Sequence, residues 1–421
     1  MTQAGERWPH WYTVVLLCGA AVFISYIDRT NISVAAIAMQ EQFSWTETTK
    51  GYVLSSFFVG YMLLMVVSGV LANRYGGKVV LGIAVLWWSL FTALTPPAAL
   101  MGFSALITAR IALGLGEAAV FPASVNMIAR WVPVAGRSRA IAICASGLSI
   151  GTMVSFPMTG WLVRDYGWPS PFYVFGAVGF VWAAAWFWKV RDGRSEPDGS
   201  AGEKETLSAT AATGAATRRI PWGLLLSTPA IWAIVVAHFC SNWSLYVMLA
   251  WLPSYFSSTF GVSLADAGVL SAAPWLGYLI MANVGGAWAD RMLRNGKSPT
   301  FVRKFMQVTA LVGASTFLLL LQGAETATMG MVLMFGACAT LALCLSGFGA
   351  NPFDVAPRHA DVVWGISNTF GTMPGIIGVA VTGWLVDRTG NFNAPLILTA
   401  VVGGVGAVVY LAFASGERKI E

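Results

Sequence analysis

The stretch TGWLVRD at residues 159–165 returns as TGWLVDR at residues 382–388, which is 223 positions later. A second pair, GVLANRYGGK at 69–78 and GAWADRMLRNGK at 286–297, has nearly the same offset, 217 positions. Two matches at almost one offset indicate that the chain consists of two related halves. Each stretch lies at the end of a long apolar run. Parallel repeats of membrane helices are typical of transporters that bind their substrate between the halves.

The composition is that of a membrane protein. Of the 421 residues, 57% are hydrophobic and 10% charged, with a mean hydropathy of +0.67, whereas about 25% of the residues of a soluble protein are charged. A helix needs about 20 apolar residues to cross a bilayer. Twelve runs qualify: 12–38, 50–72, 79–96, 98–125, 139–163, 171–189, 228–256, 265–289, 303–322, 326–350, 360–386 and 393–414. We therefore expect an all-α polytopic membrane protein with twelve transmembrane helices, arranged as two six-helix repeats.

A long polar segment divides these helices six and six. Residues 190–222 are rich in Ala, Thr, Gly, Ser and charged residues, which is typical of a flexible linker. We expect this linker to be cytoplasmic. It would join an N-terminal bundle, residues 1–189, to a C-terminal bundle, residues 223–421.

The distribution of charge predicts the orientation. The chain has 25 Lys and Arg residues against 19 Asp and Glu residues, a net charge of +6, and most of the basic residues lie in the termini and in the loops on the same side as the termini. The positive-inside rule places that side in the cytoplasm. The first run carries Asp28 and Arg29 and lacks a cleavage site, so it is not a signal peptide. We expect a multi-pass protein of the bacterial inner membrane, which is the plasma membrane of the cell. We also expect the protein to be a monomer and to have no nucleic-acid partner.

The motifs of several other functions are missing from the sequence. It has no GxxxxGK[ST] loop for ATP and no Ser-His-Asp arrangement. Its five cysteines and three histidines have the spacing of neither a metal site nor a disulfide framework. We therefore expect no enzyme activity, no cofactor and no metal, and a transporter driven by an ion gradient.

Four charged residues lie inside the apolar runs: Asp28 and Arg29 in the first, Arg110 and Glu117 in the fourth. A charge at the bilayer centre costs about 2.5–3.5 kcal/mol even on the mildest scales, so such residues usually line a polar cavity. On one helix, Arg110 and Glu117 would share a face about 10 Å apart, too far to pair with each other. The side chains of Asp28 and Arg29 would diverge by about 100°.

These residue types suit an anion and a proton. Arginine stays charged and offers paired donors to a carboxylate, phosphate or sulfonate. A buried carboxyl group can take up and release a proton. We therefore predict that Arg29 and Arg110 bind the substrate and that Asp28 and Glu117 couple it to protons. The alternative is a fixed ion pair that joins the first and fourth helices.

Other polar residues in the spans are candidates for lesser roles. We predict that further substrate contacts come from Tyr26, Tyr61, Asn242, Tyr246, Ser367 and Asn368. Each of them is also suited to a hydrogen bond between packed helices. We predict a conformational latch formed by Arg74, Lys78, Asp290 and Arg291, although these charges also suit a purely topological role. Prolines expected to break or bend helices are Pro122, Pro157, Pro253, Pro352 and Pro374.

With these residues in view, the chain resembles the major facilitator superfamily over its whole length, and within it the anion:cation symporters. That group includes bacterial sugar-acid transporters, sialin and the vesicular glutamate transporters. The motifs that carry the resemblance are YIDRTNISVA at 26–35, SFFVGY at 56–61, RIALGLGEAAVFPA at 110–123 and WGISNTFGTMPG at 364–375.

The resemblance implies roles for particular residues. It implies substrate contact by Tyr26, Arg29, Tyr61, Arg110 and Asn368, and proton handling by Asp28 and Glu117. Three residues of this chain depart from what is usual in these relatives. Asn73 stands where an acid is usual, although Asp290 keeps the acid in the second half. Leu54 and Ser241 replace a histidine and an arginine of the vesicular glutamate transporters.

The sequence thus predicts a secondary active transporter that takes up a small organic anion (a carboxylate, sugar acid or sulfonate) with protons by alternating access. An alternative is a proton-antiporting exporter of drugs or metabolites. Such exporters carry a Gly-Pro pair in the fifth helix, which is missing from GTMVSFP at residues 151–157. A receptor would need a signalling domain, and the largest segment outside the membrane is the linker.

Overall fold

The computed structural model describes residues 10–133, 136–190 and 220–420. Most of the predicted linker, residues 191–219, lies outside the described residues. The described part of the chain is helical throughout its regular structure, and twelve of its helical segments are long and apolar enough to span a membrane. The predicted fold class is therefore confirmed.

The first half of the chain contains α1 (His10–Phe43), α2 (Glu47–Tyr75), α3 (Gly77–Met101), α4 (Phe103–Glu117), α5 (Val120–Trp131), α6 (Arg137–Tyr166) and α7 (Ser170–Lys189). The second half contains α9 (Trp222–Ser227), α10 (Pro229–Phe260), α11 (Leu264–Arg294), α12 (Pro299–Leu320), η2 (Leu321–Gly323), α13 (Ala327–Leu341), η3 (Ala342–Leu345), α14 (Asn351–Val355), η4 (Pro357–His359), α15 (Ala360–Thr389) and α16 (Asn393–Phe413).

The fourth predicted span is broken close to Pro122, one of the prolines expected to break or bend a helix, by a turn at Ala118 and Ala119 that divides it into α4 and α5. Pro122 has no N–H to donate to the carbonyl of Ala118, and its ring crowds that carbonyl. The hydroxyl of Ser68 on α2 reaches the Ala118 oxygen at 3.1 Å and shares its proton with the Met65 carbonyl of its own helix, at 2.8 Å. The break is therefore satisfied from a neighbouring helix. By contrast, α6, α10 and α15 continue through their prolines.

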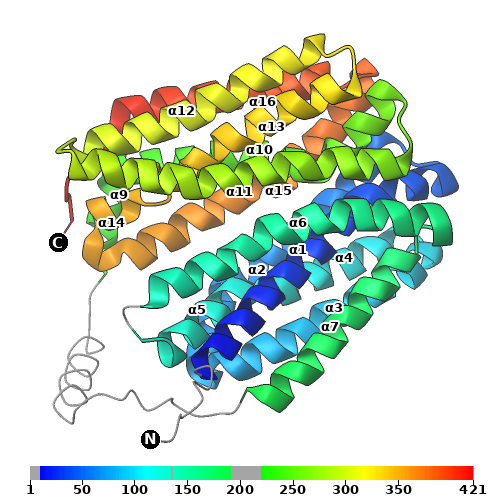
Figure 1. Ribbon diagram of the computed structural model, residues 1–421, viewed down its shortest axis with the longest axis horizontal. Helices are drawn as coiled ribbons and strands as arrows, with labels where there is room; N and C mark the ends of the chain where they lie inside the picture. The colour runs from blue at the N-terminus through cyan, green and yellow to red at the C-terminus, as the bar shows by residue number, and fades with distance from the viewer. Residues whose placement is uncertain (1–9, 134–135, 191–219, 421) are drawn as a thin grey trace, which may run out of the picture.

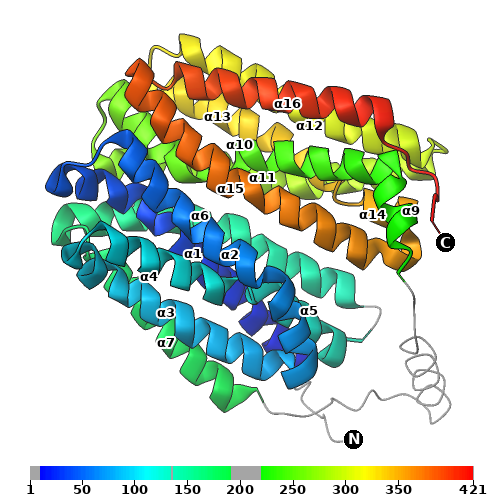
Figure 2. The ribbon, with the colours of Figure 1, turned by 180° about the vertical axis from the view of Figure 1, so that it is seen from behind.

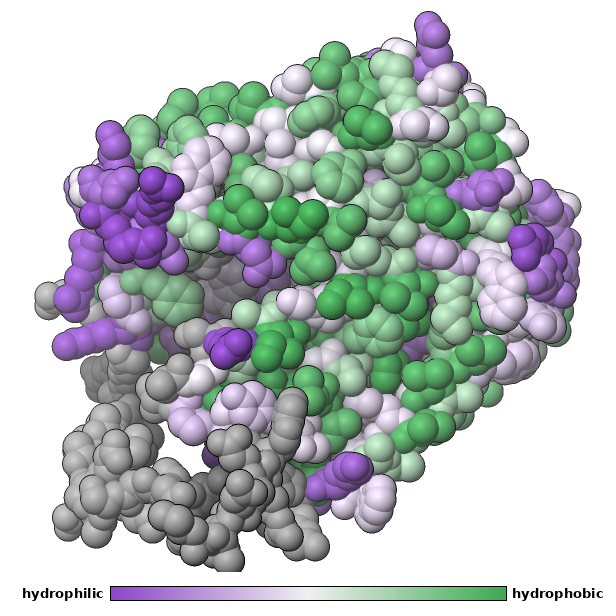
Figure 3. Space-filling view, viewed as in Figure 1, coloured by the Kyte–Doolittle hydropathy of each residue, from purple (hydrophilic) through white to green (hydrophobic). Residues whose placement is uncertain are grey.

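The helices form two bundles that lie side by side (Figures 1 and 2). Helices α1–α7 make one and α9–α16 the other. Here the terminal end is the end of the molecule at which α1 begins and α16 ends, and the turn end is the opposite end, where residues 44–46 join α1 to α2. Hydrophilic residues gather at both ends, and hydrophobic residues cover the band between them (Figure 3). This surface matches a bilayer with polar layers on either side.

The two bundles pack closely at the turn end and diverge toward the terminal end (Figures 1 and 2). Helices α2 and α15 form one side of the contact, and α6 and α11 form the other. Near its centre, the hydroxyl of Ser33 on α1 donates to the carbonyl of Leu249 on α10, at 3.0 Å.

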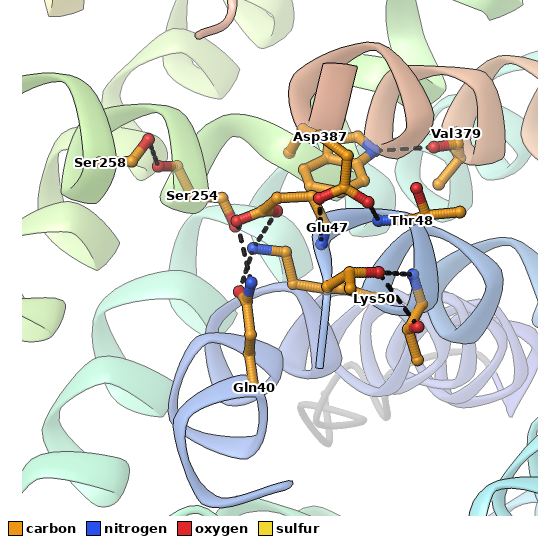
Figure 4. Close-up of polar contacts among 11 residues, drawn as sticks. Gln40, Glu47, Thr48, Lys50, Ser254, Ser258, Val379 and Asp387 are labelled. Carbon is orange, nitrogen blue, oxygen red and sulfur yellow. Dashed lines mark hydrogen bonds and ion pairs between the residues drawn. The ribbon is translucent and has the colours of Figure 1, made fainter. Parts of the chain in front are cut away.

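A carboxylate of the second bundle caps a helix of the first at the turn end (Figure 4). Asp387 of α15 accepts hydrogen bonds from the backbone N–H groups of Glu47, at 2.8 Å, and Thr48, at 2.7 Å. Those groups belong to the first turn of α2, where a helix has unsatisfied donors and a partial positive charge. The bond therefore ties the bundles together by a contact that exists only while the turn end is closed.

A buried lysine lies beside this cap. Lys50, the first residue of the second predicted span, is 2% exposed within α2. Its ammonium group binds Gln40 Oε1 at 2.7 Å and Glu47 Oε2 at 2.6 Å, and lies 5.1 Å from the ring centroid of Trp251 on α10. The lysine thus joins the ends of α1 and α2 to the second bundle (Figure 4).

The repeated stretches occupy related places but bond differently. In the first half the order is Arg164-Asp165, and these two exposed side chains pair with each other at 2.7 Å. In the second half the order is Asp387-Arg388, and the acid reaches α2. The N-termini of α2 and the corresponding α11 both have a local cap, from Thr46 and Ser263, and α2 has the Asp387 contacts in addition.

Candidate substrate and proton site

The site begins with two helices that approach unusually closely. A Cβ atom on Gly60 of α2 would overlap the carbonyl of Ile111, and one on Gly114 of α4 would overlap the carbonyl of Phe57. Only glycine permits this distance between the backbones. The approach brings Phe57 and Tyr61 of α2 against the face of α4 that carries Arg110.

Arg29 of α1 pairs with Glu117 at the end of α4. The Glu117 Oε2 atom accepts from Arg29 Nη2 at 2.9 Å, from Arg29 Nε at 3.3 Å and from the Ser25 hydroxyl at 2.8 Å. Both charged side chains are buried, at 5% and 1% exposure. The second carboxylate oxygen, Oε1, has no hydrogen-bond partner among the described residues. Glu117 therefore neutralises Arg29 through one oxygen and keeps the other available.

Three aromatic rings surround the same guanidinium group. Its carbon lies 4.7 Å from the ring centroid of Tyr26, 4.8 Å from that of Phe57 and 4.8 Å from that of Tyr61. Aromatic faces attract a cation, and more strongly away from water. The three rings belong to α1 and α2. The position of Arg29 is therefore fixed by ring contacts from these two helices as well as by its ion pair with Glu117.

Arg110 of α4 has no such partner. It is 1% exposed, and its Nε and Nη1 atoms make no hydrogen bond to any described residue. Its guanidinium carbon lies 5.6 Å from the centroid of the Phe57 ring. A buried guanidinium without an anion is costly, so this side chain is the strongest indication of an anion site in the described structure.

The side chain of Asp28 leaves α1 in a different direction from that of Arg29, so Asp28 takes no part in the Arg29–Glu117 ion pair. Its side chain is fully buried, and neither carboxylate oxygen has a hydrogen-bond partner among the described residues. Trp88 and Thr92 of α3 lie within interaction range of it without reaching hydrogen-bond geometry. The predicted divergence of Asp28 and Arg29 is therefore observed, with Asp28 directed toward α3.

The second bundle contributes polar groups on α10 and α15. Asn242 Nδ2 donates to the carbonyl of Gly371 at 2.7 Å, and the Ser367 hydroxyl bonds to His238 Nδ1 at 2.8 Å. Asn368 Nδ2 contacts the sulfur of Met65 on α2 at 3.0 Å. Asn242 and Ser367 thus connect α10 to α15, whereas Asn368 crosses between the bundles.

Tyr246 of α10 completes the cross-bundle contact. Its ring lies 4.5 Å from that of Phe58 on α2, centroid to centroid. The space enclosed between the bundles is about 10 Å³, which is about one water molecule. Its lining includes both arginines together with Phe57, Phe58, Leu54 and Leu249. Any ligand larger than a water molecule would require the side chains here to move apart.

The structure gathers most of the predicted site. Sequence reasoning gives an ion pair between the first and fourth helices as the alternative to a functional role, and the structure has one such pair, Arg29–Glu117. Arg110 and Asp28 form no ion pair with any described residue. Arg110 and Glu117 do not pair with each other, as expected. Phe57, Phe58 and Met65 are absent from the predicted set, because each reads as an ordinary apolar residue.

The predicted latch residues lie away from this centre, near the terminal end. Arg74, Asp290 and Arg291 form no ion pair with any described residue, and the guanidinium of Arg74 rests on the Tyr75 ring at 5.4 Å. Asn73 accepts from Asn126 of α5 at 2.9 Å. The latch stays a prediction, since the bundles diverge at this end. No three His, Cys, Asp or Glu side chains converge as metal ligands would anywhere in the described chain.

Comparison with known proteins identifies relatives over nearly the whole chain. The model of the Major Facilitator Superfamily matches residues 18–379. A protein of Oryza sativa subsp. japonica named probable anion transporter 4, chloroplastic, is 39% identical over 99% of this chain and 70% of its own length. The ascorbate transporter, chloroplastic, of Arabidopsis thaliana is 36% identical, covering 99% and 77%.

A third relative is the sodium-dependent phosphate transport protein 1, chloroplastic, of Arabidopsis thaliana, with 37% identity over 99% of this chain and 81% of that protein. Among solved structures, a bacterial homologue of the lysosomal transporter Spinster, inward-facing and unoccupied, superposes with a TM-score of 0.78 at 17% identity and 97% coverage of both chains. The inward-open xylose transporter XylE from E. coli gives 0.76 at 11%, with 96% coverage of both.

Proposed function

We propose that this chain, which belongs to the major facilitator superfamily of membrane transporters, moves a small organic anion together with protons by alternating access. Membership of that family makes it a transporter and not an enzyme. The observation that carries the proposal is the pair of buried arginines, of which one is neutralised by a carboxylate and the other is not.

The arrangement suggests how a proton and an anion bind together. A proton on Glu117, at the unpartnered Oε1, removes the charge that holds Arg29. Arg29 and Arg110 then both present donors to the same small space. A carboxylate that enters this space binds Arg29 and Arg110 after the proton has neutralised Glu117. The proton and the anion therefore each favour the binding of the other.

The names of the relatives support an anionic substrate. They include transporters of ascorbate and of phosphate, and both molecules are oxyanions that suit the planar donors of arginine. We favour an organic anion because the space between the bundles is lined by Leu54, Phe57, Phe58 and Leu249. These side chains suit the carbon body of a carboxylate or sugar acid better than a bare phosphate.

The expected direction of transport follows from the expected orientation of the chain in the membrane. We place the terminal end in the cytoplasm of a bacterium and the turn end outside its inner membrane, because basic residues gather at the terminal end. In this orientation the structure is closed to the outside and its bundles diverge toward the cytoplasm. A proton gradient directed inward then drives uptake.

The test uses purified protein in liposomes that contain a trapped pH dye. The vesicles are challenged with a panel of carboxylates, sulfonates and phosphate, each with and without a sodium gradient. We expect one class of organic anion to acidify the interior, and we expect Arg29→Ala and Arg110→Ala to abolish that signal. Glu117→Gln is expected to abolish proton-driven accumulation but retain anion exchange. Glu41→Gln, at an exposed acid at the end of α1, is the control.

Three results would overturn the proposal. Accumulation that persists undiminished in Glu117→Gln would remove the proton role of this residue. Transport that follows sodium rather than protons would replace the coupling ion. Efflux of lipophilic cations without movement of any anion would point to the exporter instead.

A further inference from the structure

One aromatic ring contacts both arginines of the site. Phe57 is 1% exposed, and its ring centroid lies 4.8 Å from the guanidinium carbon of Arg29 and 5.6 Å from that of Arg110. All three side chains line the same small space between the bundles. Two like charges are therefore held around a single neutral ring.

The two contacts do not carry equal weight. Arg29 also touches the rings of Tyr26 and Tyr61 and forms the ion pair with Glu117. For Arg110, the Phe57 ring is the one cation–π contact in the described structure, and two of its nitrogen atoms are without a hydrogen bond. The orientation of Arg110 thus depends on Phe57 far more than that of Arg29 does.

An aromatic face is a partner that leaves the donors of arginine free. The N–H groups of a guanidinium lie in its plane, whereas the attraction of a ring acts on the cation as a whole. A carboxylate partner would occupy those N–H groups and compete with the substrate. Phe57 instead attracts the charge without taking up hydrogen-bond capacity.

The ring itself is held firmly. Phe57 packs edge to face on Phe58, with centroids 5.3 Å apart, and lies 5.8 Å from Tyr61. Its own carbonyl lies where a Cβ on Gly114 would be, so the backbone of α2 at this residue touches α4 one turn away from Arg110. The position of the ring relative to Arg110 is therefore fixed by backbone contact as well as by packing.

We propose that Phe57 is a positioning residue for substrate binding, because its ring holds the unpaired Arg110 in the orientation that receives the anion and keeps Arg110 and Arg29 against one ring. This inference rests on the proposed function, in which both arginines bind the anion. In this inference Phe57 affects the affinity for the anion, whereas Glu117 binds the proton.

The test replaces Phe57 with phenylalanines that carry increasing numbers of ring fluorine atoms, introduced by nonsense suppression. Fluorination preserves the shape of the ring while it removes the negative charge from its face. We expect KM for the anion to rise stepwise along the series, reaching about tenfold for the most fluorinated ring. The maximal rate, the proton-to-anion ratio and Tm are expected to change little.

The matched control is the same series at Phe58. This neighbour lines the same space but packs on the Tyr246 ring and has no arginine over its face. KM is expected to stay flat there. Phe57→Leu, which removes the ring, is expected to raise KM at least as much as the most fluorinated variant, and Phe57→Tyr is expected to restore it.

The outcomes separate this inference from the function on which it rests. A flat KM across the Phe57 series, in a protein that still loses transport on Arg110→Ala, would show that Phe57 is only packing. Transport that survives both Arg29→Ala and Arg110→Ala would overturn the proposed function itself. Equal responses at Phe57 and Phe58 would assign the effect to the fluorine atoms and overturn the inference.

Discussion

The buried charges at the centre of the molecule differ in what surrounds them. Arg29 has a carboxylate and three rings, whereas Arg110 and Asp28 have no ionic partner in the described structure. Buried charge that is paired resists removal of either partner, while buried charge that is unpaired lowers stability. We therefore expect Arg29 to stabilise the fold and Arg110 to be kept for a reason other than stability.

This difference predicts opposite effects on stability. Arg29→Met leaves Glu117 buried without its partner, and we expect it to lower the free energy of unfolding by about 3–5 kcal/mol. Arg110→Met replaces an unpaired cation by an apolar side chain of similar length, and we expect Tm to stay or rise. Thermal unfolding of the purified variants in one detergent compares the two. Equal losses of Tm would show that Arg110 has a stabilising partner after all.

Sequence reasoning reaches part of this residue-level picture. Asp28, Arg29, Arg110 and Glu117 stand out because a charge in an apolar run has few structural uses. The pairing does not stand out, because Arg29 and Glu117 are 88 residues apart and only the tertiary fold brings the two side chains together. Phe57 cannot be distinguished by sequence from any other apolar residue of its helix.

At the scale of the helix, the break between α4 and α5 depends on a hydroxyl group of another helix. We expect Ser68→Ala to lower the free energy of unfolding by about 1–2 kcal/mol, because the carbonyl of Ala118 then has no donor. The comparison is Ser146→Ala, which removes a hydroxyl that bonds within its own helix, to the Ala142 carbonyl at 2.9 Å. Tm values that fall equally would contradict the bridging role of Ser68.

The close approach of α2 and α4 makes a second prediction for these helices. Gly114→Ala forces the backbones apart where Phe57 and Arg110 meet, so we expect uptake to fall more than tenfold even where the variant is made and inserted normally. Uptake is normalised to the amount of protein in the membrane. The control is Gly404→Ala on α16, where an added methyl group meets no neighbouring atom. Normal uptake by Gly114→Ala would show that the helices have room to separate.

The length and hydropathy of the runs predict the spans because a bilayer imposes both. They do not predict where a span is interrupted. Pro122 and Pro374 are equally candidates for a bend in the sequence, yet the helix ends near the first and continues through the second. The difference lies in the neighbours that receive the freed carbonyl, and those belong to other helices.

At the scale of the whole molecule, the Asp387 cap holds the turn end closed. We expect Asp387→Ala to weaken this closure by about 1 kcal/mol, which is about a fivefold change in the ratio of closed to open molecules. Spin labels on Glu41→Cys and Asn391→Cys, at exposed positions in different bundles near the turn end, report the separation. The distance distribution should shift to longer values.

The repeat supplies a control for that measurement. Asp165 occupies the related position in the first bundle but pairs with its own neighbour, Arg164. We expect Asp165→Ala to leave the distance between the labels unchanged. A similar shift in both variants would mean that Asp387 acts through general surface charge and not through the first turn of α2.

The two-bundle architecture follows from the repeat in the sequence, whereas the conformation does not. TGWLVRD and TGWLVDR differ only in the order of their last two residues, yet Asp387 bonds to α2 of the other bundle whereas Asp165 pairs with its neighbour Arg164. A repeat predicts that two elements are equivalent. The contacts of the two elements differ even though both stretches lie at the turn end.

The uneven packing of the two bundles also determines where the membrane voltage acts. Tightly packed protein separates the central arginines from the turn end, whereas the bundles diverge on the other side, so most of the electric field lies across the packed half. An ion held at the centre is then almost at the electrical potential of the solution beyond the terminal end. If the packing reverses in the proposed alternating access, the field moves past the ion while the ion stays in place. At 100 mV this transfers about 2.3 kcal/mol for each net charge carried.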